Sequence, residues 1–244
     1  MPDKPSAASS PAGPPSWLLL AAFILLAGGG AVAFLISSRK STSSRLDGKL
    51  TVLVRPPNRN LEPISVELPG AAPVKSGGAM CLDAHLSEPA FPYFIWIDSA
   101  GRVLPLYPWN NERLEVEDIS APPPERRATK LVFSPLLGGN WTFGEQPGTD
   151  TVLLVVRRTP LPPDIKLAEL LGSSSTAALG TAPSQQEVVS FLSLDAGDKA
   201  VSVTHPAPGS QQPQLLAADD PLARLMLALA PHFELIRAAR FAHQ

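Results

Sequence analysis

The sequence predicts a single N-terminal transmembrane α-helix followed by a β-rich α+β domain, with a mostly antiparallel sheet, short helices and a C-terminal helix. Residues 17–36 form a run of 20 residues without a charged side chain. A helix rises about 1.5 Å per residue, so this run matches the roughly 30 Å hydrocarbon core of a bilayer. From residue 49 onward, apolar, β-branched and aromatic residues alternate with polar ones, which indicates half-buried strands. The 28 prolines and 17 glycines predict short elements, because proline breaks helices and cannot donate to a sheet.

Two other interpretations of residues 17–36 remain open. The run would suit a buried core helix, although a helix of this length normally has a polar face. It would also suit a cleaved signal peptide with Ala31-Val32-Ala33 as the cleavage site. The apolar run continues past that site, and a single lysine, Lys4, precedes it. We therefore expect a retained membrane anchor.

The charges beside the predicted span indicate its orientation. Lys4 lies upstream, whereas four basic residues follow within about 15 positions, namely Arg39, Lys40, Arg45 and Lys49. This asymmetry predicts a cell-membrane protein whose C-terminal domain is cytoplasmic. The small residues around Gly28, Gly29 and Gly30 allow close helix approach, so a homodimer through the span is a further expectation.

Composition divides the chain into six segments. Residues 1–16 are rich in proline, serine and alanine and are expected to be a disordered tail. The remaining segments are the span at 17–36, a juxtamembrane linker at 37–48, the β-rich domain at 49–171, a flexible loop at 172–186, and a hairpin plus C-terminal helical segment at 187–244.

The β-rich domain contains several expected strands. The strongest signal is residues 93–97, which are aromatic and β-branched and lead through Asp98 and Gly101 into a second apolar run; this pattern is typical of a β-hairpin. Residues 149–157 are almost continuously apolar and predict a central strand covered on both faces. Further strands are expected at 50–54, 64–68, 80–86 and 130–133.

The C-terminal third contains helical signals as well. A short helix is expected after Pro163-Asp164, ending at Gly172. Residues 188–192 and 201–204 predict a second hairpin. Asp219-Asp220-Pro221 is typical of a helix start, and Pro231 is expected to bend or divide this helix before residues 233–241 finish the C-terminal helical segment.

Charge and cysteine content exclude several classes of protein. The formal net charge is −2, and no basic cluster longer than two residues occurs, so no nucleic-acid partner is expected. A single cysteine, Cys81, excludes an intramolecular disulfide framework and a cysteine-based zinc site.

No catalytic or metal-binding motif is evident, so the protein is expected not to be an enzyme and to have no cofactor and no metal. Cys81 and His85 lie four residues apart on an expected strand, about 13 Å from each other, which is too far for a dyad. His205, His232 and His243 are interpreted as surface or half-packed residues. Asp98 has a sufficient role as the turn residue of its hairpin.

Aromatic residues are the remaining candidates for a binding site. They recur between residues 93 and 141 and would line a groove if they were not core residues, which is the more common role of such side chains. Trp109 is expected to be the most exposed, because it follows Pro108 into a polar segment. The candidate binding residues are Tyr93, Trp96, Tyr107, Trp109 and Trp141.

These residues also support a family resemblance. The order of residues 93–103, then Leu106-Tyr107-Pro108, then Gly148-Thr149-Asp150-Thr151 resembles a bacterial domain of unknown function that is often fused to, or encoded near, serine/threonine kinases and caspase-like peptidases. Asp150 stands where glutamate is commoner in that family. The resemblance covers about residues 50–171 and implies a compact β-rich accessory domain without an assigned activity.

The expected function is that of a single-pass membrane protein with a non-catalytic β-rich domain that acts in protein interaction or regulation. A serine/threonine kinase is the partner that the resemblance implies. An envelope-facing structural or assembly protein is the main alternative, and an unrecognised hydrolase is a third hypothesis.

Overall fold

The computed structural model describes residues 45–57, 62–108, 126–133, 141–165, 170–171, 189–204 and 214–244. The chain divides into two compact units, Met1–Arg45 and Leu46–Gln244, and the description below concerns the second unit. Its elements, in chain order, are β1 (Gly48–Arg55), β2 (Ile64–Ser65), β3 (Ala79–Ile97), β4 (Val103–Tyr107), β5 (Ala128–Phe133), β6 (Gly148–Arg157), β7 (Val189–Asp195), β8 (Ser202–Thr204), β9 (Gln214–Leu215), α3 (Pro221–Leu229) and β10 (Leu235–His243).

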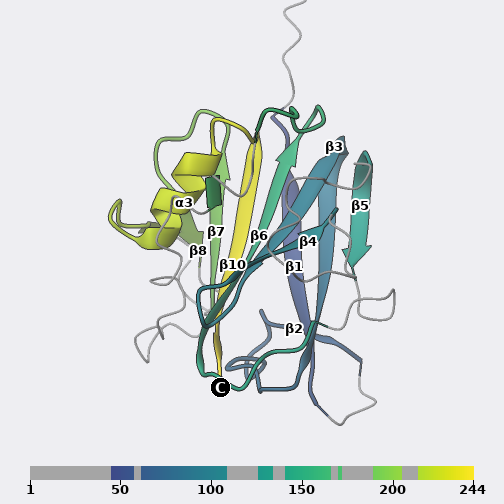
Figure 1. Ribbon diagram of the computed structural model, residues 1–244, viewed down its shortest axis with the longest axis vertical. Coiled ribbons are helices and arrows are strands. Elements are labelled where there is room, and N and C mark those ends of the chain that lie inside the picture. The colour runs from purple at the N-terminus through teal and green to yellow at the C-terminus, as the bar shows by residue number, and fades with distance from the viewer. Residues whose placement is uncertain are drawn as a thin grey trace, which may run out of the picture. The chain divides into compact units, whose positions relative to one another are not determined.

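The ten described strands form one antiparallel sheet that curls into a half-barrel (Figure 1). Its order is β2-β1-β3-β6-β10-β7-β8-β9. Strand β3 has 19 residues, and its two halves have different neighbours. The first half pairs with β1 and β5, and the second half pairs with β6 and β4. This long strand therefore joins the two halves of the sheet.

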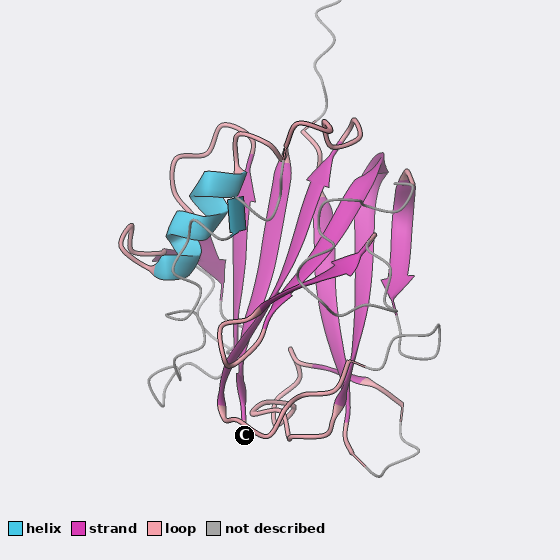
Figure 2. Ribbon diagram, viewed as in Figure 1, coloured by secondary structure: helices cyan, strands magenta, loops and turns pink. Residues whose placement is uncertain are grey.

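Strands β6 and β10, in the middle of the sheet, have buried side chains on both faces, and successive side chains along each strand point to opposite faces. On β6, Val152, Leu154 and Val156 point into the concave side of the half-barrel, where they meet the buried residues of β1 and of the first half of β3. Leu153 and Val155 point to the opposite face. Figure 2 shows α3 against the sheet, where it supplies Leu222, Leu225, Met226 and Leu229 to the second core.

Several predictions from the sequence are confirmed. Strand β6 is a central strand with nine consecutive buried residues. The hairpin of β3 and β4 turns at Asp98 and Gly101, where Gly101 has a φ of 78°. Strands β7 and β8 form the second hairpin. Asp220 caps α3, and Pro221 occupies the first turn.

The predicted fold class is wrong in its first element. No helix in the described part of the chain is long and apolar enough to cross a membrane. Helix α3 has nine residues and is about 14 Å long, half of what a bilayer needs. The predicted span at 17–36 lies outside the described residues, as does its proposed dimer face. The structure is β-rich with a short helix, and the single-pass membrane assignment and the cytoplasmic placement derived from it are corrected accordingly.

The C-terminal helix is a second correction. Residues 233–241 were expected to finish the C-terminal helical segment beyond Pro231, but Leu235–His243 is a strand that pairs with β6 on one side and with β7 on the other. The pairing with two neighbours satisfies its main-chain groups and buries Leu235, Ala239 and Phe241 in one core and Ile236 and Ala238 in the other. Tertiary pairing therefore overrides the local helical spacing.

Candidate functional site

The structure brings two of the five predicted binding residues together and separates the others. Trp96 and Trp141 both line a cavity of about 330 Å³, and each is at most 5% exposed. Tyr93 lies on the opposite face of the sheet, packs edge to face against Phe233, and accepts a hydrogen bond from the Leu161 N–H. Tyr107 is half-buried on β4, and Trp109 lies outside the described residues.

The cavity beside the two tryptophans, named here the tryptophan cavity, has charged walls. Besides the indoles it is lined by Asp98, Ser99, Ala100, Arg102, Leu104, Thr142, Gly144, Glu145, Gln146 and Asp150. Asp98 serves mainly as a turn residue, because its carboxylate accepts the N–H groups of Ala100 and Arg102 and lies 2.6 Å from the Arg102 guanidinium.

Asp150 is the most perturbed carboxyl group of this region. It is the third residue of β6 and is 1% exposed, and burial raises its pKa from 3.8 to about 7. The indole N–H of Trp96 donates to Oδ1 at 2.9 Å and the Ser99 main chain also contributes; both lower the pKa, whereas the nearby Asp98 raises it further. Near neutral pH this carboxyl group is therefore divided between its two protonation states.

His243 lies next to Asp150, although 93 positions separate them in the sequence. The pairing of β10 with β6 places His243 opposite Gly148 and Phe241 opposite Asp150. The side chains of His243 and Asp150 therefore lie on the same face of the sheet. Nδ1 of His243 is 3.1 Å from Oδ2 of Asp150, but the two atoms are not aligned for a hydrogen bond. His243 is 3% exposed, so the expectation of a surface or half-packed histidine is wrong, and this burial lowers its pKa.

One group of side chains resembles a catalytic triad in its arrangement, with Ser76 in the place of the nucleophile, His243 in that of the base and Asp150 in that of the acid. The hydroxyl of Ser76 lies 3.4 Å from Nε2 of His243. Acyl transfer also needs N–H groups directed at the developing oxyanion. The main-chain N–H groups of Ser76, Gly77 and Gly78 donate instead to the carbonyl groups of Gln244, Phe143 and Lys75. The arrangement therefore holds the loop against β10, and this geometry does not favour a hydrolase.

The Cys81–His85 pair behaves as the sequence predicts. Cys81 is buried opposite Leu53, and His85 lies opposite Lys49. The ring of His85 is exposed and contacts Asp83 at 3.2 Å. The two residues are four positions apart on one strand, so about 13 Å separates them. Among the residues that the structure describes, no group of three or more His, Cys, Asp or Glu residues is placed to hold a metal ion.

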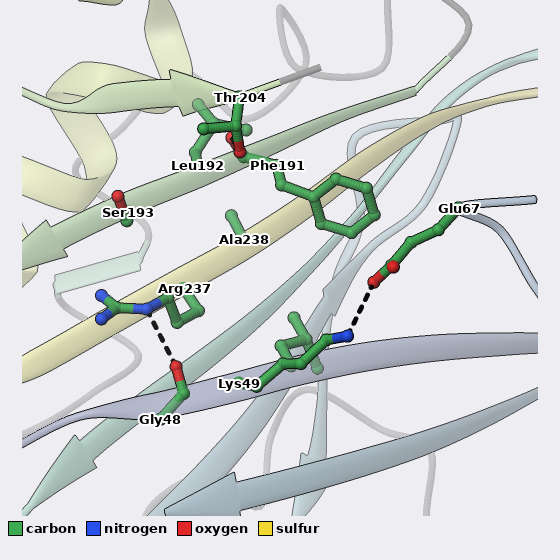
Figure 3. A pocket seen from close by; sticks show the side chains of 10 residues that line it. Gly48, Lys49, Glu67, Phe191, Leu192, Ser193, Thr204, Arg237 and Ala238 are labelled. Atoms are coloured by element: carbon green, nitrogen blue, oxygen red, sulfur yellow. Dashed lines mark hydrogen bonds and ion pairs between the residues drawn. The ribbon is translucent and has the colours of Figure 1, made fainter. Parts of the chain in front are cut away.

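A second depression follows the open seam of the half-barrel, where the start of β1, which β2 does not cover, approaches β10 and β7. Figure 3 shows this groove, named here the seam groove. It has a volume of about 380 Å³ and is lined by Gly48, Lys49, Leu50, Glu67, Phe191, Leu192, Ser193, Thr204, Arg237 and Ala238. None of these residues was a candidate from the sequence, because they come from five separate segments of the chain.

Polar contacts define the borders of the seam groove. Nε of Arg237 donates to the Gly48 carbonyl at 3.1 Å, and the same guanidinium reaches Asp195 at 2.5 Å and Asp47 at 3.2 Å. Lys49 and Glu67 form an exposed ion pair at 3.6 Å, which contributes about 1 kcal/mol at most. The Phe191 ring lies toward the Lys49–Glu67 end of the groove rather than toward the Arg237 guanidinium (Figure 3).

The chain was compared with protein-family models, with curated proteins and with solved structures, and no match was found in any of the three. The functional conclusions below therefore depend on the geometry of the two sites.

Proposed function

We propose that this chain is a non-catalytic binding module that holds a segment of a partner protein in the seam groove. The observation that carries this proposal is the open seam itself. It leaves a groove of about 380 Å³ beside the start of β1, which β2 does not cover; this volume is within the size range of ligand sites in proteins.

The main chain of β1 favours a polypeptide as the occupant. The carbonyl groups of Gly48 and Val52 both point away from β3, because Arg237 and the Val66 N–H donate to them. Alternate residues of a strand direct their main-chain groups to the same side. Leu50 lies between Gly48 and Val52 in this alternation, so its N–H and carbonyl groups point to the floor of the seam groove. An extended segment satisfies such groups by strand addition.

The side chains of the groove suit the same occupant. Phe191 offers an apolar surface, Ser193 and Thr204 offer hydroxyl groups, and Lys49 and Glu67 offer weakly held charges of both signs. A mixed lining of this kind is typical of protein interfaces, where aromatic anchors are surrounded by polar groups. The resemblance to a domain found beside serine/threonine kinases makes a kinase segment the first partner to test.

The test is selection of peptides from a displayed random library on the full chain, followed by a groove-filling variant. Thr204 and Thr129 are both exposed threonines on strands, and Thr204 alone lines the seam groove. We expect enriched peptides to bind the wild type and Thr129→Trp equally and Thr204→Trp at least tenfold more weakly, measured by isothermal titration calorimetry. Failure to enrich any peptide, or equal binding by the two variants, would exclude the seam groove as the binding site.

A further inference from the structure

We propose that the tryptophan cavity binds a small organic cation, namely an ammonium or guanidinium group. This site goes beyond the proposed function, because the cavity shares no lining residue with the seam groove. Its failure would leave the seam-groove proposal untouched.

The balance of charge in the cavity is negative. Three carboxyl groups line it, those of Asp98, Glu145 and Asp150, against one guanidinium, that of Arg102. Arg102 is already committed to Asp98 through contacts of 2.6 Å. His243 lies behind Asp150, and because burial lowers its pKa it adds no positive charge at neutral pH. A cationic ligand therefore meets an excess of negative charge.

Asp150 supplies a buried acceptor at the wall of the cavity. Its Oδ1 accepts the Trp96 indole N–H, and Oδ2 lies 3.1 Å from Nδ1 of His243 without a hydrogen bond in the described part of the chain. Because burial lowers the pKa of His243, this neighbour does not neutralise the carboxylate, and a buried charge without an opposite charge is costly. An ammonium or guanidinium group in the cavity, which Asp150 lines, would supply the missing positive charge.

The two indoles add a second attraction for the same chemistry. Trp96 is fixed by its hydrogen bond to Asp150 and by an edge-to-face contact with Phe143, whose ring centroid lies at 5.8 Å. Trp141 forms another part of the wall. A cation near an indole face is attracted by the negative charge of the ring face. A volume of about 330 Å³ is at the lower end for ligand sites, so the cavity fits a small amine or a single side chain.

The cation has two possible sources, a free amine or a lysine or arginine side chain of another protein, and the test separates them. Butylammonium and its neutral isostere butan-1-ol are titrated into the full chain by calorimetry, and so are two blocked tripeptides, acetyl-Gly-Lys-Gly-amide and acetyl-Gly-Arg-Gly-amide. We expect saturable binding of butylammonium and at least tenfold weaker binding of butan-1-ol. Tighter binding of a tripeptide than of butylammonium would identify a protein side chain as the source, and the reverse order would identify a free amine.

The role of Asp150 is tested with Asp150→Asn, and Asp164→Asn serves as the matched control because Asp164 is exposed and lines neither the tryptophan cavity nor the seam groove. The affinity for butylammonium should fall at least tenfold in Asp150→Asn and stay unchanged in Asp164→Asn. With a pKa of about 7 for Asp150, its ionised fraction rises from about one tenth at pH 6 to about nine tenths at pH 8, so the wild-type affinity should rise about tenfold over this range.

Equal binding of butylammonium and butan-1-ol would overturn the proposal, and so would a wild-type affinity that is independent of pH. Near-UV circular dichroism establishes whether Asp150→Asn is folded. If that variant does not fold, the isostere pair and the pH dependence of the wild type still decide the question.

Discussion

Single residues show most clearly which contacts are invisible in the sequence. The aromatic pattern singles out Trp96, but it does not indicate that the Trp96 indole donates to Asp150, 54 positions later. Nor does it indicate that His243 lies against the same carboxyl group. The register of β6 between β3 and β10 creates this cluster, and register depends on long-range pairing.

Asp150 should make the stability of the protein depend on pH. Below pH 3.8 the group is protonated in both the folded and the unfolded chain. As the pH rises toward 7, the unfolded chain loses this proton while the folded chain keeps it, because burial raises the pKa in the folded state. The stability contributed by the protonated group is therefore lost as the pH rises from about 4 to about 7.

The measurement is the free energy of unfolding of the wild type and of Asp150→Asn in urea, from pH 4 to pH 8. Asparagine stays neutral, so we expect the wild type to lose stability relative to the variant by on the order of 4 kcal/mol over this range. His243 is present in both proteins, and its contribution largely cancels in the difference. Parallel stability curves would show that Asp150 is not perturbed.

Elements were predictable where local signals and tertiary contacts agree. Helix α3 has a capping aspartate, a proline in its first turn and apolar residues at helical spacing, and each of these occurs in the structure. Residues 235–243 carry a similar apolar spacing, yet they form β10 because strands β6 and β7 flank them. Local periodicity does not distinguish a helix from a strand that is buried on both faces.

The N-cap of α3 gives a prediction at this scale. Oδ1 of Asp220 accepts the Leu222 and Ala223 N–H groups, at 2.7 and 3.4 Å, and Oδ2 contacts Arg240 at 3.3 Å. We expect Asp220→Ala to lower the free energy of unfolding by about 1–2 kcal/mol and Asp220→Ser to restore most of the loss, because serine also caps helices. Asp219→Ala is the matched control and should change stability by less than about 0.5 kcal/mol. A large effect of Asp219→Ala on the free energy of unfolding would show that Asp219, rather than Asp220, is the capping residue.

At the scale of the whole molecule, side-chain contacts rather than a strand ladder bridge the open seam of the half-barrel. Strand β1 meets β10 without pairing with it, and Arg237 spans the gap to Gly48 and Asp47 while it also binds Asp195 of β7. Gly48 permits this approach, since a Cβ there would lie within 3 Å of side-chain atoms of Leu86 and Leu235.

Arg237→Met should therefore weaken the closure of the seam. The variant keeps an apolar side chain of similar length but removes the guanidinium contacts to Asp195 and to the Gly48 carbonyl. We expect a loss of about 2–3 kcal/mol in the free energy of unfolding, measured in urea, because a partly buried charge loses its partner. Arg224→Met on the exposed side of α3 is the control and should have little effect. A similar loss in both variants would show that Arg237 has no special role.

The sequence by itself determined the β-rich character of this chain, the two hairpins, the central strand β6 and the start of α3, because alternation, turn residues and caps act within a few positions. The described part of the chain holds no helix that could cross a membrane, and the predicted C-terminal helix was wrong, since apolar spacing alone does not distinguish a helix from a strand that is buried on both faces. Both candidate sites were decided by the tertiary structure. The seam groove and the tryptophan cavity combine residues up to about 190 and 55 positions apart, and only the pairing of distant strands places such residues side by side.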